Sequence, residues 1–594
     1  MKKERKQGAL PELLEFAGGY RVLTACSVIL SALSALLALA PFVFLYRIIR
    51  EVLAVAPDFA QATGMIRNGW MAVGASLLSM LIYFTALICS HIAAFRTAGN
   101  IRIALLEKIA LLPAGAIEGI GTGKARRIVT ESSAATETYL AHRLPDLAAS
   151  VATPLGILVL LFVFDWRFGL ASLAPMIFSF MAMWSMAGPN MKEDMRNYQD
   201  ALSNMSNEAT EYVRGIPVVK TFGQTVHSFR RFKASIDNYY KFCISYTKNA
   251  RRPMMRFTVL LNSAFAFLTA LTLILTAGRS VPVSLSQSVL FYVIFTPQVA
   301  TVLNRILFAS EDNMMIADSL SRIHSLLDLE PLPVSDAPKI PEGASVEFDR
   351  VTFRYPGAAR DAVSELSFTA EPGTVTALVG PSGGGKTTVA ALVSRFFDAT
   401  SGAVRIGGVD VRDIPPETLS DKIAYVFQDS RLLKRSILEN VRLGRPDASR
   451  EAVLDALRRA QCDDILAKLP DGLDTVIGAK GTYLSGGEQQ RIAIARMILK
   501  DAPIIVLDEA TAFADPENEA LVQKSFEELA KGKTVLMIAH RLTTVRNADN
   551  ILVLKDGTLE ESGSHKELMR KRGLYAAMWN EYRSAVQWKV GVSA

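Results

Sequence analysis

Long apolar runs dominate the first 330 residues of this 594-residue chain. A helix needs about 20 predominantly apolar residues to cross the hydrocarbon core of a bilayer. Segments of that kind fall at 21–47, 69–95, 143–164, 167–188, 255–278 and 282–308. We therefore expect six membrane-spanning helices, so that about half of the chain has lipid as its solvent.

The positive charges are grouped at one end of these spans. The formal net charge of +7 would be compatible with nucleic-acid binding. The basic groups are Lys2, Lys3, Arg5 and Lys6 before the first span, Arg126 and Arg127 after the second, and Arg251, Arg252 and Arg256 before the fifth. This bias is typical of the cytoplasmic face. Because no basic groove with interleaved aromatics accompanies it, we expect no nucleic-acid partner.

The connections between the spans differ in length. The turns at 165–167 and 279–282 are tight and are expected to face outward, whereas 96–143 and 191–254 are long, charged and helical in pattern. These inner helices are expected to project into the cytoplasm. There they either transmit motion to a soluble domain, which the sequence that follows favours, or form a solvated scaffold.

Composition divides the chain into three parts: a six-helix membrane domain over 1–330, a proline-rich linker over 331–344 and a soluble α/β domain over 345–594. The apolar stretch 22–46 is too long for the h-region of a signal peptide and is expected to remain as an anchor. No disulfide framework is implied by the four cysteines, Cys26, Cys89, Cys243 and Cys462.

A phosphate-binding loop is predicted near the start of the soluble domain. A strand over 374–379 leads into GPSGGGKTT and then into a helical pattern, the order that a P-loop requires. Backbone N–H groups of such a loop surround phosphate, a lysine adds a cation and a hydroxyl is available for Mg²⁺. The predicted binding residues are Gly380, Ser382, Gly383, Gly385, Lys386, Thr387 and Thr388, with Thr387 also a metal ligand. ATP and Mg²⁺ are the expected cofactors.

Two acids follow a second apolar strand, at 504–507. Asp508 is positioned by sequence to hold the water shell of the metal, and Glu509 to orient and deprotonate the attacking water. Helix-capping acids are the plainer interpretation, but they do not account for the companion motifs.

The string LSGGEQQR at 484–491 lies between these two motifs, and on it the chain resembles the ABC transporter family. The resemblance implies that Ser485, Gly486 and Gly487 contact the γ-phosphate of an ATP molecule bound to the nucleotide-binding domain of a second chain. These residues begin a helix, and a helix N-terminus attracts anions. The resemblance implies that the chain works only as a dimer with a second half, either identical or related.

The resemblance extends over essentially the whole chain and implies roles for further residues. Tyr355 matches the aromatic that stacks on adenine, and Gln428 matches the catalytic-loop glutamine that senses the metal and the membrane domain. Asp515 matches the acid that communicates across the dimer, and His540 the catalytic switch histidine on the γ-phosphate. The stretch 211–223 resembles the coupling segment of exporter-type half-transporters.

Two departures from the family pattern bear on function. Ala479 replaces the acid of the commoner TEVGERG string, which implies altered cross-talk to the coupling helices. Phe513 and Ala514 precede Asp515 in ATAFADPENE, a form similar to that of a subgroup whose exporter-shaped halves take up ferric siderophores. Both departures suggest a non-identical partner, although every catalytic motif for a homodimer is present.

Polar and aromatic residues in the spans are candidates for the cargo site. They are Asn262, Tyr292, Pro297 and Gln298, with Phe291 and Phe295. A helix–helix interface is the alternative for such polar residues. A weakly polar, aromatic cavity would suit lipids, amphiphilic drugs, peptides or an aromatic metal chelate.

Three functions remain open at this point. The first is ATP-driven uptake of a ferric siderophore, and the second is export of a lipid, drug or peptide by the same machinery. The third is a nucleotide-gated channel or regulator, which Glu509 and His540 disfavour because gating needs no efficient hydrolysis. In each case we expect a multi-pass protein in contact with membrane lipid, in a bacterial inner membrane with the nucleotide-binding domain in the cytoplasm.

Overall fold

A computed structural model describes residues 9–184, 189–221, 230–277, 282–427, 431–478, 483–508, 516–539 and 542–590. Two compact units divide the chain: Met1–Glu107 with Arg126–Asp328, and Lys108–Ala125 with Leu329–Ala594. The first unit is helical and the second contains two β-sheets. The predicted fold class, a helical membrane region followed by an α/β domain, is confirmed.

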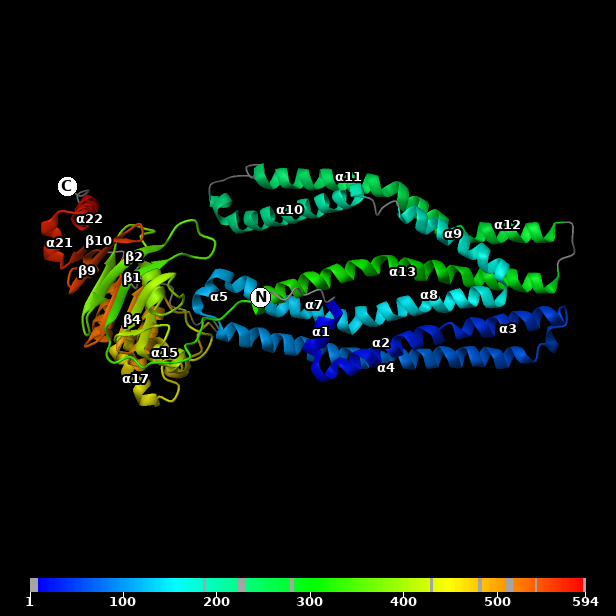
Figure 1. Cartoon of the computed structure of the whole chain (residues 1–594). Helices are drawn as coiled ribbons and strands as arrows, with labels where there is room; N and C mark the ends of the chain where they lie inside the picture. The colour runs from blue at the N-terminus through cyan, green and yellow to red at the C-terminus, as the bar shows by residue number, and fades with distance from the viewer. Residues whose placement is uncertain are drawn as a thin grey trace. The chain divides into compact units, whose positions relative to one another are not determined.

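The helices of the first unit follow the predicted apolar segments and the charged connections between them (Figure 1). They are α1 (Ala9–Ala17), α2 (Arg21–Leu37), α3 (Ala40–Val55), α4 (Gly64–Leu111), α7 (Ser133–Thr138), α8 (Leu144–Phe164), α9 (Trp166–Trp184), α10 (Pro189–Thr221), α11 (Arg230–Leu261), α12 (Ala264–Thr276) and α13 (Val283–Leu327). Short 3₁₀ turns lie at Gly18–Tyr20 and Phe59–Gln61, and π-helical turns at Ile128–Ser132 and Tyr139–Arg143.

The described residues of the six predicted spans lie mainly on helix, but not every helix is a full span by length and composition. Within the described ranges four helical stretches qualify: Leu10–Val55, Gly64–Leu111, Thr122–Phe164 and Trp166–Trp184. A fifth is added if α11 and α12, bent by 43° at their break, form one span. The apolar part of α13, Val283–Val299, is shorter. A helical membrane region is therefore confirmed, while six complete spans remain a prediction.

An aromatic cluster forms the core between α3, α8, α9 and α13. Phe291, Tyr292 and Phe295 on successive turns of α13 are fully buried, and Phe291 and Phe295 stack with ring centroids 5.2 Å apart. The hydroxyl of Tyr292 lies 2.5 Å from the carbonyl oxygen of Leu161 and 2.9 Å from that of Asp165. This contact joins α13 to the end of α8. The polar group therefore fastens a helix–helix interface.

The second unit contains a four-stranded antiparallel sheet of order β2-β1-β4-β5 and a six-stranded sheet of order β10-β9-β3-β8-β7-β6. The strands are β1 (Val346–Phe353), β2 (Val363–Ala370), β3 (Val375–Val379), β4 (Ser401–Ile406), β5 (Val409–Asp410), β6 (Ile423–Val426), β7 (Ile504–Asp508), β8 (Thr534–Ile538), β9 (Asn550–Lys555) and β10 (Thr558–Gly563). Strands β9, β3, β8, β7 and β6 are parallel neighbours. Their carboxyl ends therefore meet at one edge, where open α/β sheets bind ligands.

Helices surround these sheets and enclose the apolar core of the unit. They are α5 (Ala114–Ile120), α6 (Thr122–Arg127), α14 (Lys386–Val393), α15 (Pro416–Lys422), α16 (Ile437–Arg442), α17 (Arg450–Arg459), α18 (Asp463–Lys468), α19 (Gly486–Lys500), α20 (Pro516–Ala530), α21 (His565–Lys571) and α22 (Leu574–Val590), with 3₁₀ turns at Gly472–Asp474 and Leu542–Val545. The buried strands β3, β7 and β8 read as continuous apolar runs because both of their faces are covered.

The predicted linker is irregular in structure and is tied to the second unit. The backbone N–H of Lys339 donates to the carbonyl of Asp413 at 2.9 Å, and the hydroxyl of Ser335 lies 3.1 Å from the Asp413 carboxylate. Arg395, whose side chain is 5% exposed, donates to the carbonyl of Pro333 at 2.6 Å. The segment that leaves the membrane helices is therefore held by several hydrogen bonds on the surface of the α/β domain.

Candidate nucleotide site and membrane cavity

The glycine-rich loop joins β3 to α14 at the carboxyl edge of the six-stranded sheet. Gly380, Gly383 and Gly385 have φ values of +145°, +80° and +92°, which L side chains rarely adopt. A Cβ on Gly380 would collide with the carbonyl oxygen of Leu554, and one on Gly385 would lie 2.5 Å from the carbonyl oxygen of Ala362. The backbone conformation and the close packing both require glycine.

Lys386 is the first residue of α14 and is 5% exposed. Its ammonium donates to the carbonyl oxygens of Gly380 at 3.0 Å and Pro381 at 2.9 Å, so the lysine lies across its own loop. Ser382 and Thr387 are exposed. A lysine, exposed hydroxyls and a helix N-terminus are thus brought together on one loop.

Thr388 and Tyr355 lie together, although the sequence assigned them to separate parts of the nucleotide. Thr388 is buried, and its hydroxyl is 3.1 Å from that of Tyr355. The Tyr355 ring makes edge-to-face contacts with Phe353 and Phe397, at centroid distances of 4.9 and 5.3 Å. These contacts link the predicted adenine platform to the first turns of α14.

Asp508 ends β7 and is 8% exposed. The hydroxyl of Tyr425, on the neighbouring strand β6, donates to its Oδ2 at 3.3 Å. Burial raises the pKa of Tyr425 far above its ordinary value, and the charge of Asp508 adds to the rise. The phenol therefore stays protonated and acts as the donor to the carboxylate.

Four predicted residues lie outside the described part of the chain: Gln428, Glu509, Asp515 and His540. The strands that precede three of them in sequence are described. β6, β7 and β8 end at Val426, Asp508 and Ile538, and pairing places Val426 opposite Leu507 and Asp508 opposite Ile538. These strand ends and the end of β3 share the edge that carries the P-loop.

The signature string begins α19 with a capping box. The hydroxyl of Ser485 accepts from the N–H of Glu488, and the Glu488 carboxylate accepts from the N–H of Ser485 at 2.8 Å. Burial acts to raise the pKa of Glu488, but the hydrogen bonds from Ser485 outweigh it and lower the pKa. Ser485 and Gly486 are exposed at this helix N-terminus, where backbone N–H groups favour an anion.

Arg491 fixes the signature helix to its neighbour. Its side chain is fully buried and makes a bidentate pair with Asp464 at 2.7 and 2.9 Å, besides a hydrogen bond to the carbonyl of Gln461. The hydrogen bonds from Arg491 lower the pKa of Asp464. The pair joins α19 to α18 by a charge-assisted, bidentate contact in the second turn of α19.

The described residues fit Mg²⁺-ATP. The glycine cradle excludes side chains, Lys386 and the start of α14 favour phosphate, and Thr387 and Asp508 supply the oxygen ligands that Mg²⁺ prefers. A helix N-terminus with a glycine-rich turn is the usual protein device for binding such phosphates.

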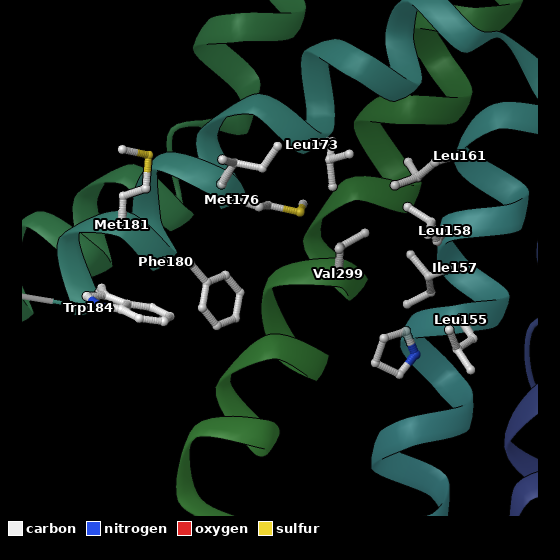
Figure 2. A pocket seen from close by; sticks show the side chains of 12 residues that line it. Leu155, Ile157, Leu158, Leu161, Leu173, Met176, Phe180, Met181, Trp184 and Val299 are labelled. Carbon is white, nitrogen blue, oxygen red and sulfur yellow. The ribbon is translucent and has the colours of Figure 1, made fainter. Parts of the chain in front are cut away.

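A cavity of about 440 Å³ lies in the first unit, between α8, α9 and one residue of α13 (Figure 2). All of its lining side chains are apolar: Pro154, Leu155, Ile157, Leu158, Leu161, Leu173, Met176, Ile177, Phe180, Met181, Trp184 and Val299. Its volume is within the range of about 300–1,000 Å³ that is usual for small-molecule sites. Such a lining disfavours ionic ligands, because they would lose hydration without gaining partners.

The residues that the sequence offered as candidates for a cargo site do not line this cavity. Phe291, Tyr292 and Phe295 are fully buried in the helix core, and Asn262, directly after α11, donates to the carbonyl of Thr258 in that helix. The side chains in Figure 2 come instead from α8, α9 and Val299 and are mainly aliphatic. Hydropathy identified the spans, but it carried no signal for which helix faces leave space between them.

Two contacts of the second unit were also missed. Gly115 on α5 is buried against the ring of Phe397, and a Cβ at this position would clash with that ring. The Tyr425–Asp508 contact joins residues 83 positions apart. A glycine in a short helical stretch signals close approach, but the sequence does not indicate what approaches it.

Comparison with known proteins places this architecture in a family. The model "ABC transporter" matches residues 363–512, and "ABC transporter transmembrane region" matches residues 24–298. Mycobactin import ATP-binding/permease protein IrtA of Mycobacterium tuberculosis is 38% identical over 93% of this chain and 64% of that relative. The ATP-dependent lipid A-core flippase of Methylobacillus flagellatus is 31% identical over 86% of this chain and 87% of that protein.

A solved structure described as a bacterial Atm1-family ABC exporter with ATP bound gives a TM-score of 0.72 at 26% identity, and covers 94% of this chain and 98% of that one. The chain belongs to the ABC transporter family. Family membership and the apolar helices place the chain in a membrane. The chain spans about 64% of the length of the IrtA relative.

Proposed function

We propose that this chain is one half of an ATP-driven importer of ferric siderophores in a bacterial inner membrane, with its nucleotide-binding domain in the cytoplasm. The observation that carries the ATP-driven part is the P-loop at the edge of a parallel sheet where β7 ends in Asp508. The cargo rests on the 38% identity to a protein named for import of mycobactin, which is a siderophore, and on the ATAFADPENE string.

In this proposal the phosphates of ATP lie on the backbone of Gly380, Gly383 and Gly385 and near the ammonium of Lys386. Thr387, Asp508 and Gln428 would hold Mg²⁺, which would supply positive charge to the phosphates. Glu509 takes the proton of the attacking water, and His540 contacts the γ-phosphate.

The second half completes each ATP site. Ser485, Gly486 and Gly487 of one chain face the γ-phosphate held by the other, and Asp515 acts across the same interface. The support for this is the exposed, capped N-terminus of α19, which Arg491 holds in place. A related, non-identical partner fits the replacement of the usual acid by Ala479 better than an identical copy does.

The cavity between α8 and α9 receives the apolar part of the cargo. Its aliphatic lining suits an alkyl chain or an uncharged face of a chelate, and membrane lipid is the competing occupant. Export of a lipid or another amphiphile is the second candidate function, since it is favoured by the same lining and by the likeness to a lipid A-core flippase.

Stimulation of ATP hydrolysis in reconstituted protein tests the proposal. The chain and a related half are placed in lipid nanodiscs and titrated with ferric siderophores that carry or lack an alkyl chain, and separately with lipids. The proposal predicts saturable stimulation by a ferric siderophore and none by its iron-free form. Stimulation by lipid alone would favour export, and no ATP hydrolysis under any condition would contradict both functions.

A matched pair of variants tests the cavity. Leu158 lines it, whereas Val159 is an exposed neighbour on the same helix that does not. Leu158→Trp should displace about two methylene groups of cargo, at about 0.8 kcal/mol each. The siderophore concentration that gives half-maximal stimulation of ATP hydrolysis should therefore rise about tenfold. Val159→Trp should leave it unchanged; equal effects of the two variants would exclude the cavity as the cargo site.

A further inference from the structure

Tyr425 is the third residue of β6, and its register places it opposite Val506 on β7. Its hydroxyl donates to Oδ2 of Asp508 at 3.3 Å, and Tyr425 lies three residues before Gln428 in sequence. The carboxylate itself is nearly buried. One oxygen of Asp508 is therefore engaged by a neutral donor from the adjacent strand.

Aromatic packing holds the Tyr425 ring. Its centroid lies 5.2 Å from that of Phe396 and 4.5 Å from that of Phe427. The torsion that rotates an aspartate carboxylate has a broad, roughly two-fold distribution. The carboxylate therefore needs a hydrogen-bond partner to fix its orientation. A hydroxyl on a ring that is held in place by packing supplies such a partner.

We propose that Tyr425 is a positioning residue, which orients Asp508 toward the water shell of Mg²⁺ through its hydroxyl. This inference rests on the proposed ATP-driven function. Carboxylates that serve a metal are commonly oriented by an outer hydrogen bond, and loss of such a partner typically costs about 10–100-fold in metal affinity or activity. The role is specific to the phenolic oxygen, since phenylalanine keeps the packing.

Tyr425→Phe in the full chain, with the partner half present, tests this. Binding of trinitrophenyl-ATP is measured in EDTA and then across a Mg²⁺ titration. The variant should keep metal-free nucleotide affinity within about twofold and raise the half-saturating Mg²⁺ concentration about tenfold. The matched control is Tyr575→Phe, which also removes a buried hydroxyl, 2.7 Å from His565 Nδ1 on α21, and should behave as wild type.

Two results would overturn the inference: an unchanged Mg²⁺ requirement in Tyr425→Phe, or an equal shift in Tyr575→Phe. Failure of the proposed function looks different, because the wild-type protein itself would then show no nucleotide binding that responds to Mg²⁺.

Discussion

Gly115→Ala is predicted to weaken the seating of α5 on the nucleotide-binding domain. Gly115 is buried against Phe397, and an added Cβ would lie well under 3.0 Å from the ring, a separation that real Cβ atoms essentially never show. Phe397 is itself in contact with Phe353 and Tyr355, so the ring cannot move without disturbing its neighbours. Either α5 or the aromatic cluster must shift.

The magnitude follows from the cost of overpacking. Inserting one carbon into a well-packed site typically costs about 1–3 kcal/mol. A free energy of that size corresponds to a factor of about 5–150 in the equilibrium between seated and unseated α5. Since α5 lies between α4 and the following membrane segment in sequence, the loss should appear as poor coupling of ATP hydrolysis to cargo.

Gly119→Ala is a matched control on the same helix, because nothing lies within 4 Å of the Cβ that it adds. Alanine is favoured over glycine in a helix by about 1 kcal/mol, so this variant should be neutral or stabilising. The assay compares thermal unfolding and cargo-stimulated ATP hydrolysis of both variants in nanodiscs. Equal behaviour of Gly115→Ala and Gly119→Ala would refute the reasoning, as would failure of Phe397→Leu to relieve the Gly115→Ala defect.

Three further substitutions have definite expected results. Glu509→Gln should keep ATP binding and lower hydrolysis at least about 100-fold, as single-turnover assays would show; near-normal turnover would remove its assignment as the base. Lys386→Ala should weaken nucleotide binding itself, because it removes the cation of the loop, and unchanged affinity in equilibrium binding would contradict that role. Tyr292→Phe should lower the free energy of unfolding by about 1–3 kcal/mol in thermal melts, since the carbonyls of Leu161 and Asp165 lose a buried partner; wild-type stability would count against this.

Features that depend on local sequence could be predicted. The positions of the apolar helices follow from the hydrophobic length that a bilayer requires, and the P-loop follows from the order of strand, glycines and helix. The structure shows why the glycines at 380 and 385 are required: their backbone angles and the nearby carbonyls leave no room for a side chain. The roles of Gln428, Glu509, Asp515 and His540 stay predictions.

Features that depend on packing between distant segments could not be predicted. The cavity arises where the faces of α8 and α9 fail to close, which hydropathy along either helix does not encode. Tyr425 meets Asp508 only because β6 and β7 are neighbours in the sheet. Phe291 and Phe295 are apolar in either setting, so the sequence could not distinguish a cavity wall from a buried core.

Movement of cargo across a sealed membrane tests the central claim most directly. The vesicles have a defined orientation and contain this chain and a related half-transporter. ATP is supplied on the side of the nucleotide-binding domains, and labelled ferric siderophore is added to the other side. The account predicts that the ferric siderophore accumulates, in an ATP-dependent manner, on the side of the nucleotide-binding domains, and that Glu509→Gln abolishes this accumulation. Movement of lipid or siderophore in the opposite direction, or accumulation that persists in the Glu509→Gln variant, would contradict it.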